Sequence, residues 1–322
     1  MRLALFARTA LAGALLAAAA QAAAQEYPAK PVRMIVGFAA GGGTDTTARP
    51  IAHKLSELFG QQVIVDNRPG AAGNIATDFV AKAGPDGYTI LMGTIAALSI
   101  NPSLYSNLPF DPERDLAPVT QAVDSTNILS LHASVPANSV KELIELAKSK
   151  SLNYGSSGVG GTGHLAGELF NLMTGVKLVH VPYKGGAPAM VDLVAGRVEL
   201  VFATAASAVP HIKAGRIKGI AVTTGKRSAL MPELPTIAEA GLAGFEANNW
   251  YGLMVPANTP RAIINRLNAE TVKVLGMPDV KTFLFNQGLE AAPSTPEEFG
   301  AYIRSERAKW AKIVKASGAK VE

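Results

Sequence analysis

The sequence contains no cysteine, which excludes thiol catalysis, zinc knuckles and iron–sulfur ligation. Its five histidines, His53, His132, His164, His180 and His211, fall in no HExxH or HxxxH spacing. The composition therefore argues against a structural or catalytic metal, and we expect neither a metal nor a cofactor.

Charged residues are also scarce, at 17% of the chain. The 30 Lys plus Arg and 25 Asp plus Glu give a net charge of +5. Arg2 and Arg8 lie in a segment that we expect to be removed, and the remaining 28 basic and 25 acidic residues give a net charge of +3. A charge this small does not indicate nucleic-acid binding. With 48% hydrophobic residues, the chain has enough apolar material for a packed core, and its length suggests about two domains.

The first 24 residues resemble an export signal. Two arginines precede an apolar run at residues 10–20, and Ala22, Ala23 and Ala24 form a small-residue cleavage site, so we expect cleavage after Ala24. The run is shorter than the roughly 20 residues that span a bilayer. With no Arg-Arg pair and no cysteine, the twin-arginine route is disfavoured and a lipid anchor is excluded. We expect a free protein in the periplasm.

Strand and helix patterns alternate along the rest of the chain. We expect strands at residues 32–38, 63–66, 88–93, 153–155, 178–181, 200–203 and 217–223. We expect helices at residues 48–59, 74–82, 140–150, 165–173, 187–194, 208–214, 261–275, 280–286 and 296–315. Thr295 and Glu298 form a capping box at the start of the last helix, and Pro50 predicts an irregular or kinked first turn in the first one.

This alternation predicts an α/β protein with two lobes, each a mainly parallel sheet flanked by helices. Extended segments at 119–131 and 245–255 are expected to connect the lobes as a hinge. The expected division is residues 25–125 for the first part of lobe I, residues 126–248 for lobe II and residues 249–322 for the return to lobe I.

Two glycine-rich loops, at residues 39–45 and 156–163, each precede a predicted helix. Residues 158–163 match GxGxxG, but the next strand, which ends near Tyr183, offers no carboxylate for a ribose hydroxyl, and dinucleotides are scarce in the periplasm. Free N–H groups at a helix start favour an anion instead. The alternative is that the glycines only permit tight turns.

No catalytic constellation is evident. The sequence lacks GxSxG, and its one S-x-x-K, at 317–320, lies in the tail. A hydrolase would require turnover that depends on Ser156 or His164. His164 could be a ligand contact or a base, but a histidine at a helix start is more often a surface or packing residue. Asp45 either faces a ligand or compensates the helix dipole, and Trp250 and Tyr251 either line a cleft or belong to the hinge core.

Several motifs together resemble one family. They are Tyr-Pro-Ala-Lys-Pro-Val-Arg at 27–33, Gly-Phe-Ala-Ala-Gly-Gly-Gly-Thr-Asp at 37–45, Asp-Asn-Arg-Pro-Gly-Ala-Ala-Gly-Asn at 66–74, Pro-Asp-Gly-Tyr-Thr at 85–89 and His-Val-Pro-Tyr-Lys-Gly-Gly-Ala-Pro-Ala at 180–189. The chain resembles the Bug family, the TctC-like extracytoplasmic solute receptors of tripartite tricarboxylate transporters. The resemblance implies a type II periplasmic binding protein, whose two α/β lobes close on a ligand.

The resemblance also implies a site for a small organic carboxylate and no chemical reaction. Together with Asp45, the candidate ligand-binding residues are Phe38, Ala39, Gly43, Thr44, Thr94, Ala96, Ser156, Thr162 and Thr204. Many relatives carry an Asp where this chain has Ala203 and Thr204, which disfavours an amino-acid ligand. The implied partners are the membrane permease subunits of such a transporter, and the alternative is a sensing subunit that docks on a membrane sensor kinase. We expect a monomer.

Overall fold

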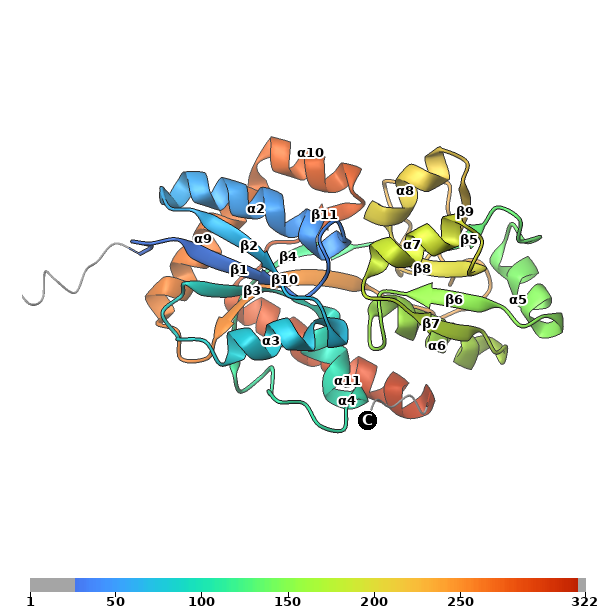
Figure 1. Ribbon diagram of the computed structural model, residues 1–322, viewed down its shortest axis with the longest axis horizontal. Helices are drawn as coiled ribbons and strands as arrows, with labels where there is room; N and C mark the ends of the chain where they lie inside the picture. The colour runs from blue at the N-terminus through green and yellow to red at the C-terminus, as the bar shows by residue number, and fades with distance from the viewer. Residues whose placement is uncertain (1–26, 318–322) are drawn as a thin grey trace, which may run out of the picture.

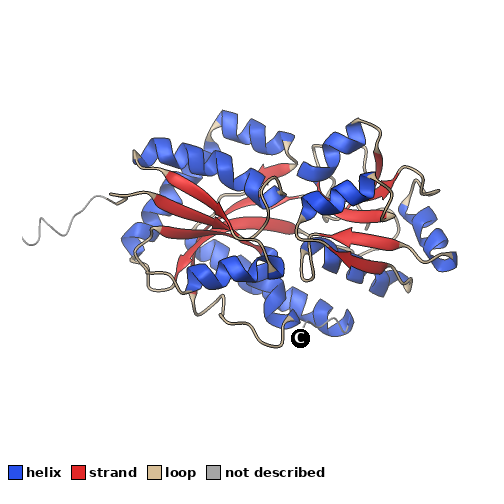
Figure 2. Cartoon of the chain, viewed as in Figure 1, coloured by secondary structure: helices blue, strands red, loops and turns tan. Residues whose placement is uncertain are grey.

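The computed structural model describes residues 27–317, so the expected signal peptide at residues 1–24 lies outside the described residues. Figures 1 and 2 show two α/β lobes, each with a central sheet between layers of helices. The two-lobed architecture predicted from the sequence is therefore confirmed. None of the helices between residues 27 and 317 has both the length and the apolar character that a membrane span needs.

Lobe I contains a six-stranded sheet in the order β11-β4-β10-β3-β1-β2. Its strands are β1 (Val32–Val36), β2 (Val63–Asn67), β3 (Thr89–Thr94), β4 (Leu116–Ser125), β10 (Asn249–Pro256) and β11 (Leu289–Ala291). Its helices are α2 (Gly43–Phe59), η1 (Ala71–Gly73), α3 (Asn74–Ala81), η2 (Ala96–Ile100), α4 (Asn101–Leu104), α9 (Arg261–Gly276), α10 (Pro278–Asn286) and α11 (Pro296–Ser317).

Lobe II contains a five-stranded sheet in the order β7-β6-β8-β5-β9. Its strands are β5 (Asn127–His132), β6 (Asn153–Ser156), β7 (Val179–Pro182), β8 (Leu200–Thr204) and β9 (Ile217–Val222). Its helices are α5 (Val140–Ser149), α6 (Thr162–Thr174), α7 (Gly186–Val194) and α8 (Ala205–Lys213).

Both sheets are mixed, whereas the sequence predicted mainly parallel sheets. The strand–helix–strand units pair in parallel, as β1 does with β2 and β3, and as β6 does with β7 and β8. The strands on either side of the lobe crossings run antiparallel to their neighbours: β10 to β3 and β4, and β5 to β8 and β9. A chain that enters the sheet from the other lobe has no crossover helix to impose parallel pairing.

The central strands are buried on both faces, which explains their nearly continuous apolar sequence. In β1, Met34 packs in a core with α2, α9 and α10, whereas the adjacent Ile35 packs in the core on the opposite face. That second core continues from α3 and α11 into α5 and α6 of lobe II, and a third core lies under α7 and α8. One apolar core therefore extends across both lobes on the α11 side.

The start of α11 agrees with the sequence prediction, whereas the start of α2 does not. The capping box is confirmed: Glu298 N–H donates to Thr295 Oγ1 at 3.2 Å and Thr295 N–H donates to Glu298 Oε2 at 2.8 Å. Helix α2, in contrast, begins at Gly43 and continues through Pro50, five residues earlier than expected and as one helix. Gly42 has extended backbone angles and ends the preceding loop, so the start of α2 lies at the glycine run.

Candidate functional site

A cavity lies between the two lobes, and both sheets contribute to its wall. From lobe I it receives the loop after β1 and the end of β3; from lobe II it receives the end of β8 and the loops that precede α6 and α7. Such crevices at the carboxyl ends of strands are where α/β sheets bind ligands. The lining residues are Phe38, Ala39, Gly42, Gly43, Thr44, Thr94, Ala96, Asn127, Ser157, Gly161, Thr162, Gly163, Gly185, Gly186, Ala187, Val201, Phe202, Ala203, Thr204, Asn249 and Tyr251.

Four helices begin at this cavity: α2, α6, α7 and α8. Their N-cap residues all line it, and these are Gly42, Gly161, Gly185 and Thr204. None of the four helices has a side-chain capping hydrogen bond at its start. The first N–H groups of a helix have no partner within the helix, and its dipole favours negative charge there. The cavity therefore combines groups of free donors at the starts of α2, α6 and α7, whereas the first N–H of α8, that of Ala205, already donates to Thr126 O at 2.8 Å.

Within the part of the chain that the structure describes, every side chain that lines the cavity is uncharged. An anion inside it would have backbone N–H groups, hydroxyls and amides as partners in place of a guanidinium or an ammonium group. The N–H groups among these donors are part of the folded backbone, so they bind without the loss of side-chain rotamer freedom that a long cationic side chain incurs. Residues 27–317 contain no group of three or more acidic or histidine side chains placed to hold a metal ion.

The polar side chains in the cavity are partly preorganised by one another. Asn127 Nδ2 donates to Thr162 Oγ1 at 3.2 Å, and Asn249 Nδ2 donates to Tyr251 Oη at 3.1 Å. Two further buried atoms, Thr94 Oγ1 and Asn127 Oδ1, have no partner among the described residues. A buried polar atom without a partner is costly, and a ligand or an ordered water removes that cost.

The sequence candidates divide into two groups. Those that line the cavity are Phe38, Ala39, Gly43, Thr44, Thr94, Ala96, Thr162 and Thr204. Asp45 and Ser156 do not line it. Each one instead accepts a hydrogen bond from a backbone N–H group of a glycine loop.

Asp45 supports the loop that precedes α2. Its carboxylate accepts hydrogen bonds from Gly41 N–H at 3.0 Å, from Arg49 Nε at 2.8 Å and from Asn67 Nδ2 at 2.9 Å. Burial alone would raise the pKa of Asp45, but the hydrogen bonds from Arg49, Gly41 and Asn67 outweigh it and lower the pKa below its usual value. All of its partners are therefore within the protein, and it fixes the loop shape.

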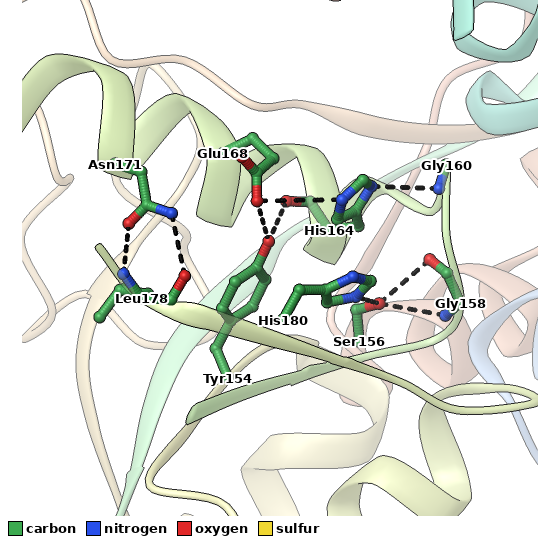
Figure 3. A network of polar contacts seen from close by, with 9 residues as sticks. All are labelled: Tyr154, Ser156, Gly158, Gly160, His164, Glu168, Asn171, Leu178 and His180. Atoms are coloured by element: carbon green, nitrogen blue, oxygen red, sulfur yellow. Dashed lines mark hydrogen bonds and ion pairs between the residues drawn. The ribbon is translucent and has the colours of Figure 1, made fainter. Parts of the chain in front are cut away.

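Ser156 supports the second glycine loop as part of a buried polar network (Figure 3). Its hydroxyl lies 2.7 Å from His180 Nε2, accepts from Gly158 N–H at 3.1 Å and contacts Gly158 O at 3.0 Å. A serine beside a histidine can be a nucleophile, but Ser156 has no exposed surface. The hydroxyl is thus committed to the loop, and the cavity presents the neighbouring Ser157 instead.

His164 belongs to the same network. Its Nδ1 accepts from Gly160 N–H at 3.1 Å, and its ring stacks on that of His180 with centroids 4.1 Å apart. Burial lowers the pKa of His164 to about 4, and burial together with the charge of His164 lowers the pKa of His180 to about 3. Both rings are neutral at pH 7, as the acceptor role of His164 requires. His164 does not line the cavity.

Sequence reasoning missed part of the wall. The missed residues include Asn127, Asn249, Val201, Phe202 and residues 185–187 at the start of α7. Asn127 and Asn249 each begin the strand that follows a crossing between lobes, and both are buried. The sequence left open whether Trp250 and Tyr251 line the cleft or belong to the hinge core. Tyr251 lines the cavity, whereas Trp250 points to the other side and packs on Phe299 and Tyr302.

The fold and the interlobe cavity define a two-lobed solute-binding protein. The family model described as the tripartite tricarboxylate transporter family receptor matches residues 47–319, and the chain belongs to this family. It is a family of solute-binding receptors. The relationship predicted from the sequence motifs is therefore confirmed.

Individual relatives cover nearly the whole chain. It is 39% identical over 291 residues to a protein from the tcbD-tcbE intergenic region of Pseudomonas sp. strain P51, covering 89% of this chain and 86% of the relative. It is 36% identical over 307 residues to BugT of Bordetella pertussis, covering 94% of each.

Solved structures of similar proteins include ligand complexes. A Rhodopseudomonas palustris protein with adipate is 40% identical, with a TM-score of 0.89 and coverage of 92% of this chain and 100% of that one. MatC from the same species, with bound malate, is 30% identical, with a TM-score of 0.85 and coverage of 89% and 100%. Each of the two ligands is a small dicarboxylate.

Proposed function

We propose that this protein is an exported receptor that captures a small organic carboxylate in the cavity between its lobes. The observation that carries the proposal is the meeting of the N-termini of α2, α6 and α7, without side-chain caps, at one uncharged cavity. Family membership and the two relatives solved with dicarboxylates support the same class of ligand.

The proposed ligand contacts come from both lobes. In lobe I they are Phe38, Ala39, Gly43, Thr44, Thr94 and Ala96, and in lobe II they are Thr162 and Thr204. A ligand that contacts both lobes binds the closed arrangement better than an open one, and it shifts the population toward closure. The closed receptor then delivers the carboxylate to the membrane permease subunits of a tripartite tricarboxylate-type transporter, without chemical change.

Thermal unfolding tests this function directly. The protein lacking residues 1–24 is unfolded and refolded to remove carried-over ligand, and is then heated with mono-, di- and tricarboxylates, amino acids and neutral solutes. A ligand at about 100 times its dissociation constant adds roughly 2.7 kcal/mol, which raises Tm by several degrees for a chain of this size. Stabilisation by one carboxylate class supports the proposal, and no stabilisation by any acid contradicts it.

A further inference from the structure

A further cavity lies on the far side of the crossings between the lobes, and Asn249 lines both it and the interlobe cavity. In lobe I, β4 and β10 lie between the strands that end at the interlobe cavity, β1 and β3, and the edge strand β11. In lobe II, β5 likewise lies between β8 and the edge strand β9. The further cavity is lined by Glu290 of β11, by Thr126 at the first crossing and by Lys226 in the loop after β9. We call it the rear cavity.

The two cavities respond in opposite ways to a rotation of the lobes about the crossings. When rigid lobes rotate so that the interlobe cavity narrows, the rear cavity widens, and the reverse rotation narrows the rear cavity. An attraction between the two walls of the rear cavity therefore favours the open receptor. A ligand has to overcome that attraction when it shifts the population toward closure.

The lobe I wall of the rear cavity carries two neighbouring carboxylates. Asp124 of β4 and Glu290 of β11 lie directly opposite each other in the antiparallel pair, and both residues are exposed. Like charges in this position destabilise a sheet. Neither carboxylate forms an ion pair within residues 27–317, although Asp124 Oδ1 accepts a hydrogen bond from Gln121 Nε2 at 2.7 Å. The stability of the sheet therefore does not account for the pair.

The lobe II wall carries an ammonium group without a partner. Lys226 is exposed, and its side chain forms no ion pair or hydrogen bond with the residues that the structure describes. The adjacent Arg227 is instead paired with Glu239 at 2.8 Å, within lobe II. Glu246, which precedes β10 and also lines the rear cavity, accepts a hydrogen bond from Asn248 Nδ2 at 2.5 Å. The rear cavity thus places two carboxylates of lobe I opposite one unpaired ammonium group of lobe II.

We propose that Lys226 and the Asp124–Glu290 pair act as an electrostatic latch that favours the open, ligand-free receptor. In this structure Lys226 pairs with neither carboxylate across a rear cavity of about 480 Å³, as expected when the latch is released. Narrowing of the rear cavity brings the opposite charges together. Lys226 is thus a positioning residue for ligand capture that no ligand touches. The proposal goes beyond the proposed function, because it concerns the protein without ligand.

Pulsed electron–electron resonance between two spin labels measures lobe opening in the refolded, ligand-free protein. The chain has no cysteine, so Ile75→Cys on α3 and Val191→Cys on α7 give one exposed label on each lobe. The test variants are Lys226→Glu, Glu290→Lys and the two combined. Lys177→Glu is the control, since Lys177 is an exposed lysine of lobe II that lines neither cavity and forms no ion pair within the described part of the chain.

We expect each single variant to raise the ratio of closed to open receptor roughly fivefold, the size of one partly exposed ion pair. The affinity for adipate should rise by the same factor while the open form predominates. The combined variant exchanges the two charges and should return toward the wild-type distances. At about 1 M salt the wild type should shift toward the closed form, because the attraction is screened. Lys177→Glu should leave the distances unchanged.

Three results would overturn the latch. They are unchanged distances in both single variants, a shift of either one toward the open form, and a shift toward closure that the combined variant does not reverse. The third result would indicate a local structural effect of the substitutions. A failure of adipate and every other carboxylate to bind would instead overturn the proposed function, whereas the distances measured without ligand would still decide whether the latch exists.

Discussion

Gly160 of lobe II lies directly against Asn101 of lobe I. A Cβ atom added to Gly160 would lie 2.4 Å from Asn101 Oδ1 and 3.0 Å from Leu104 Cδ2, and Gly160 has a φ of 82°. Asn101 is itself held by a hydrogen bond of 2.6 Å from its Nδ2 to Asn74 Oδ1. The glycine loop that supports the cavity in lobe II thus meets a fixed surface of lobe I.

We predict that Gly160→Ala weakens carboxylate binding by roughly tenfold, because the added methyl group clashes across the lobes and the loop loses a residue suited to positive φ. Calorimetry gives the affinity, and circular dichroism verifies the fold. The double variant Gly160→Ala/Asn101→Ala separates the two causes. Partial recovery of affinity in it indicates the interlobe contact, and an unchanged affinity in Gly160→Ala would contradict the account.

A bulky residue at the start of α2 should block the cavity. A Cβ at Gly43 would lie 2.9 Å from Tyr251 Oη and 3.4 Å from Thr204 Oγ1. Gly43→Val is therefore expected to reduce affinity by at least about 100-fold, while the chain still folds. Gly84→Val is the control, since nothing lies within 4 Å of a Cβ there. Wild-type affinity in Gly43→Val would remove this end of α2 from the site.

Thr94→Val tests a hydroxyl with no protein partner. Thr94 lines the cavity, and its Oγ1 is buried without a hydrogen-bond partner among the described residues. If it donates to the bound carboxylate, removing it costs about 1.4 kcal/mol of binding, or tenfold in affinity. The free energy of unfolding without ligand should stay equal or rise slightly, because valine has no polar atom to leave unpaired.

Thr271→Val provides the matched control. Thr271 Oγ1 is also buried and has no hydrogen-bond partner among residues 27–317, but it lies on α9 and does not line the cavity. Its replacement should affect stability in the same direction and leave ligand affinity unchanged. If the two variants behave alike in both assays, Thr94 is a structural residue.

Acid should destabilise the stacked histidine pair. Both His164 and His180 have folded-state pKa values, about 4 and about 3, below the unfolded value of about 6.5. Between about pH 6.5 and pH 4 the unfolded chain therefore binds more protons than the folded one, and stability falls as pH decreases. Each histidine contributes to this loss, most steeply near pH 5, where it is protonated in the unfolded chain and neutral in the folded one.

Urea unfolding at pH 7, 6 and 5 measures this loss. The variant His164→Asn/His180→Gln keeps an acceptor for Gly160 N–H and a polar partner for Ser156, and it cannot be protonated in this range. Its stability should depend less steeply on pH than that of the wild type. Identical slopes would show that the pair does not titrate as described.

The sequence predicted the architecture well because strand and helix periodicities are local signals. It did not separate β4 from β5 within residues 119–131, since only Thr126 intervenes and the chain passes straight from one sheet into the other without a turn signal. Antiparallel pairing at the crossings was missed for the same reason: it depends on how the lobes are joined.

The candidate site was predictable where a glycine loop or a strand end marks it. Thr44, Thr94 and Thr204 belong to this class. Asn127 and Asn249 carry no such mark, because their place in the wall depends on the two crossings between lobes. Asp45 and Ser156 were placed in the right loops, but the sequence does not show which way a loop side chain turns. Their hydrogen bonds to loop N–H groups decide that direction.

The most direct measurement compares adipate with adipamide, its neutral diamide of nearly equal size, by calorimetric titration of the refolded wild-type protein at two salt concentrations. An anion site built from helix N-termini in an enclosed cavity predicts binding of adipate at both concentrations and much weaker binding of adipamide. Equal binding of the two compounds, or binding of adipamide alone, would contradict the claim that this cavity recognises a carboxylate through its backbone donors.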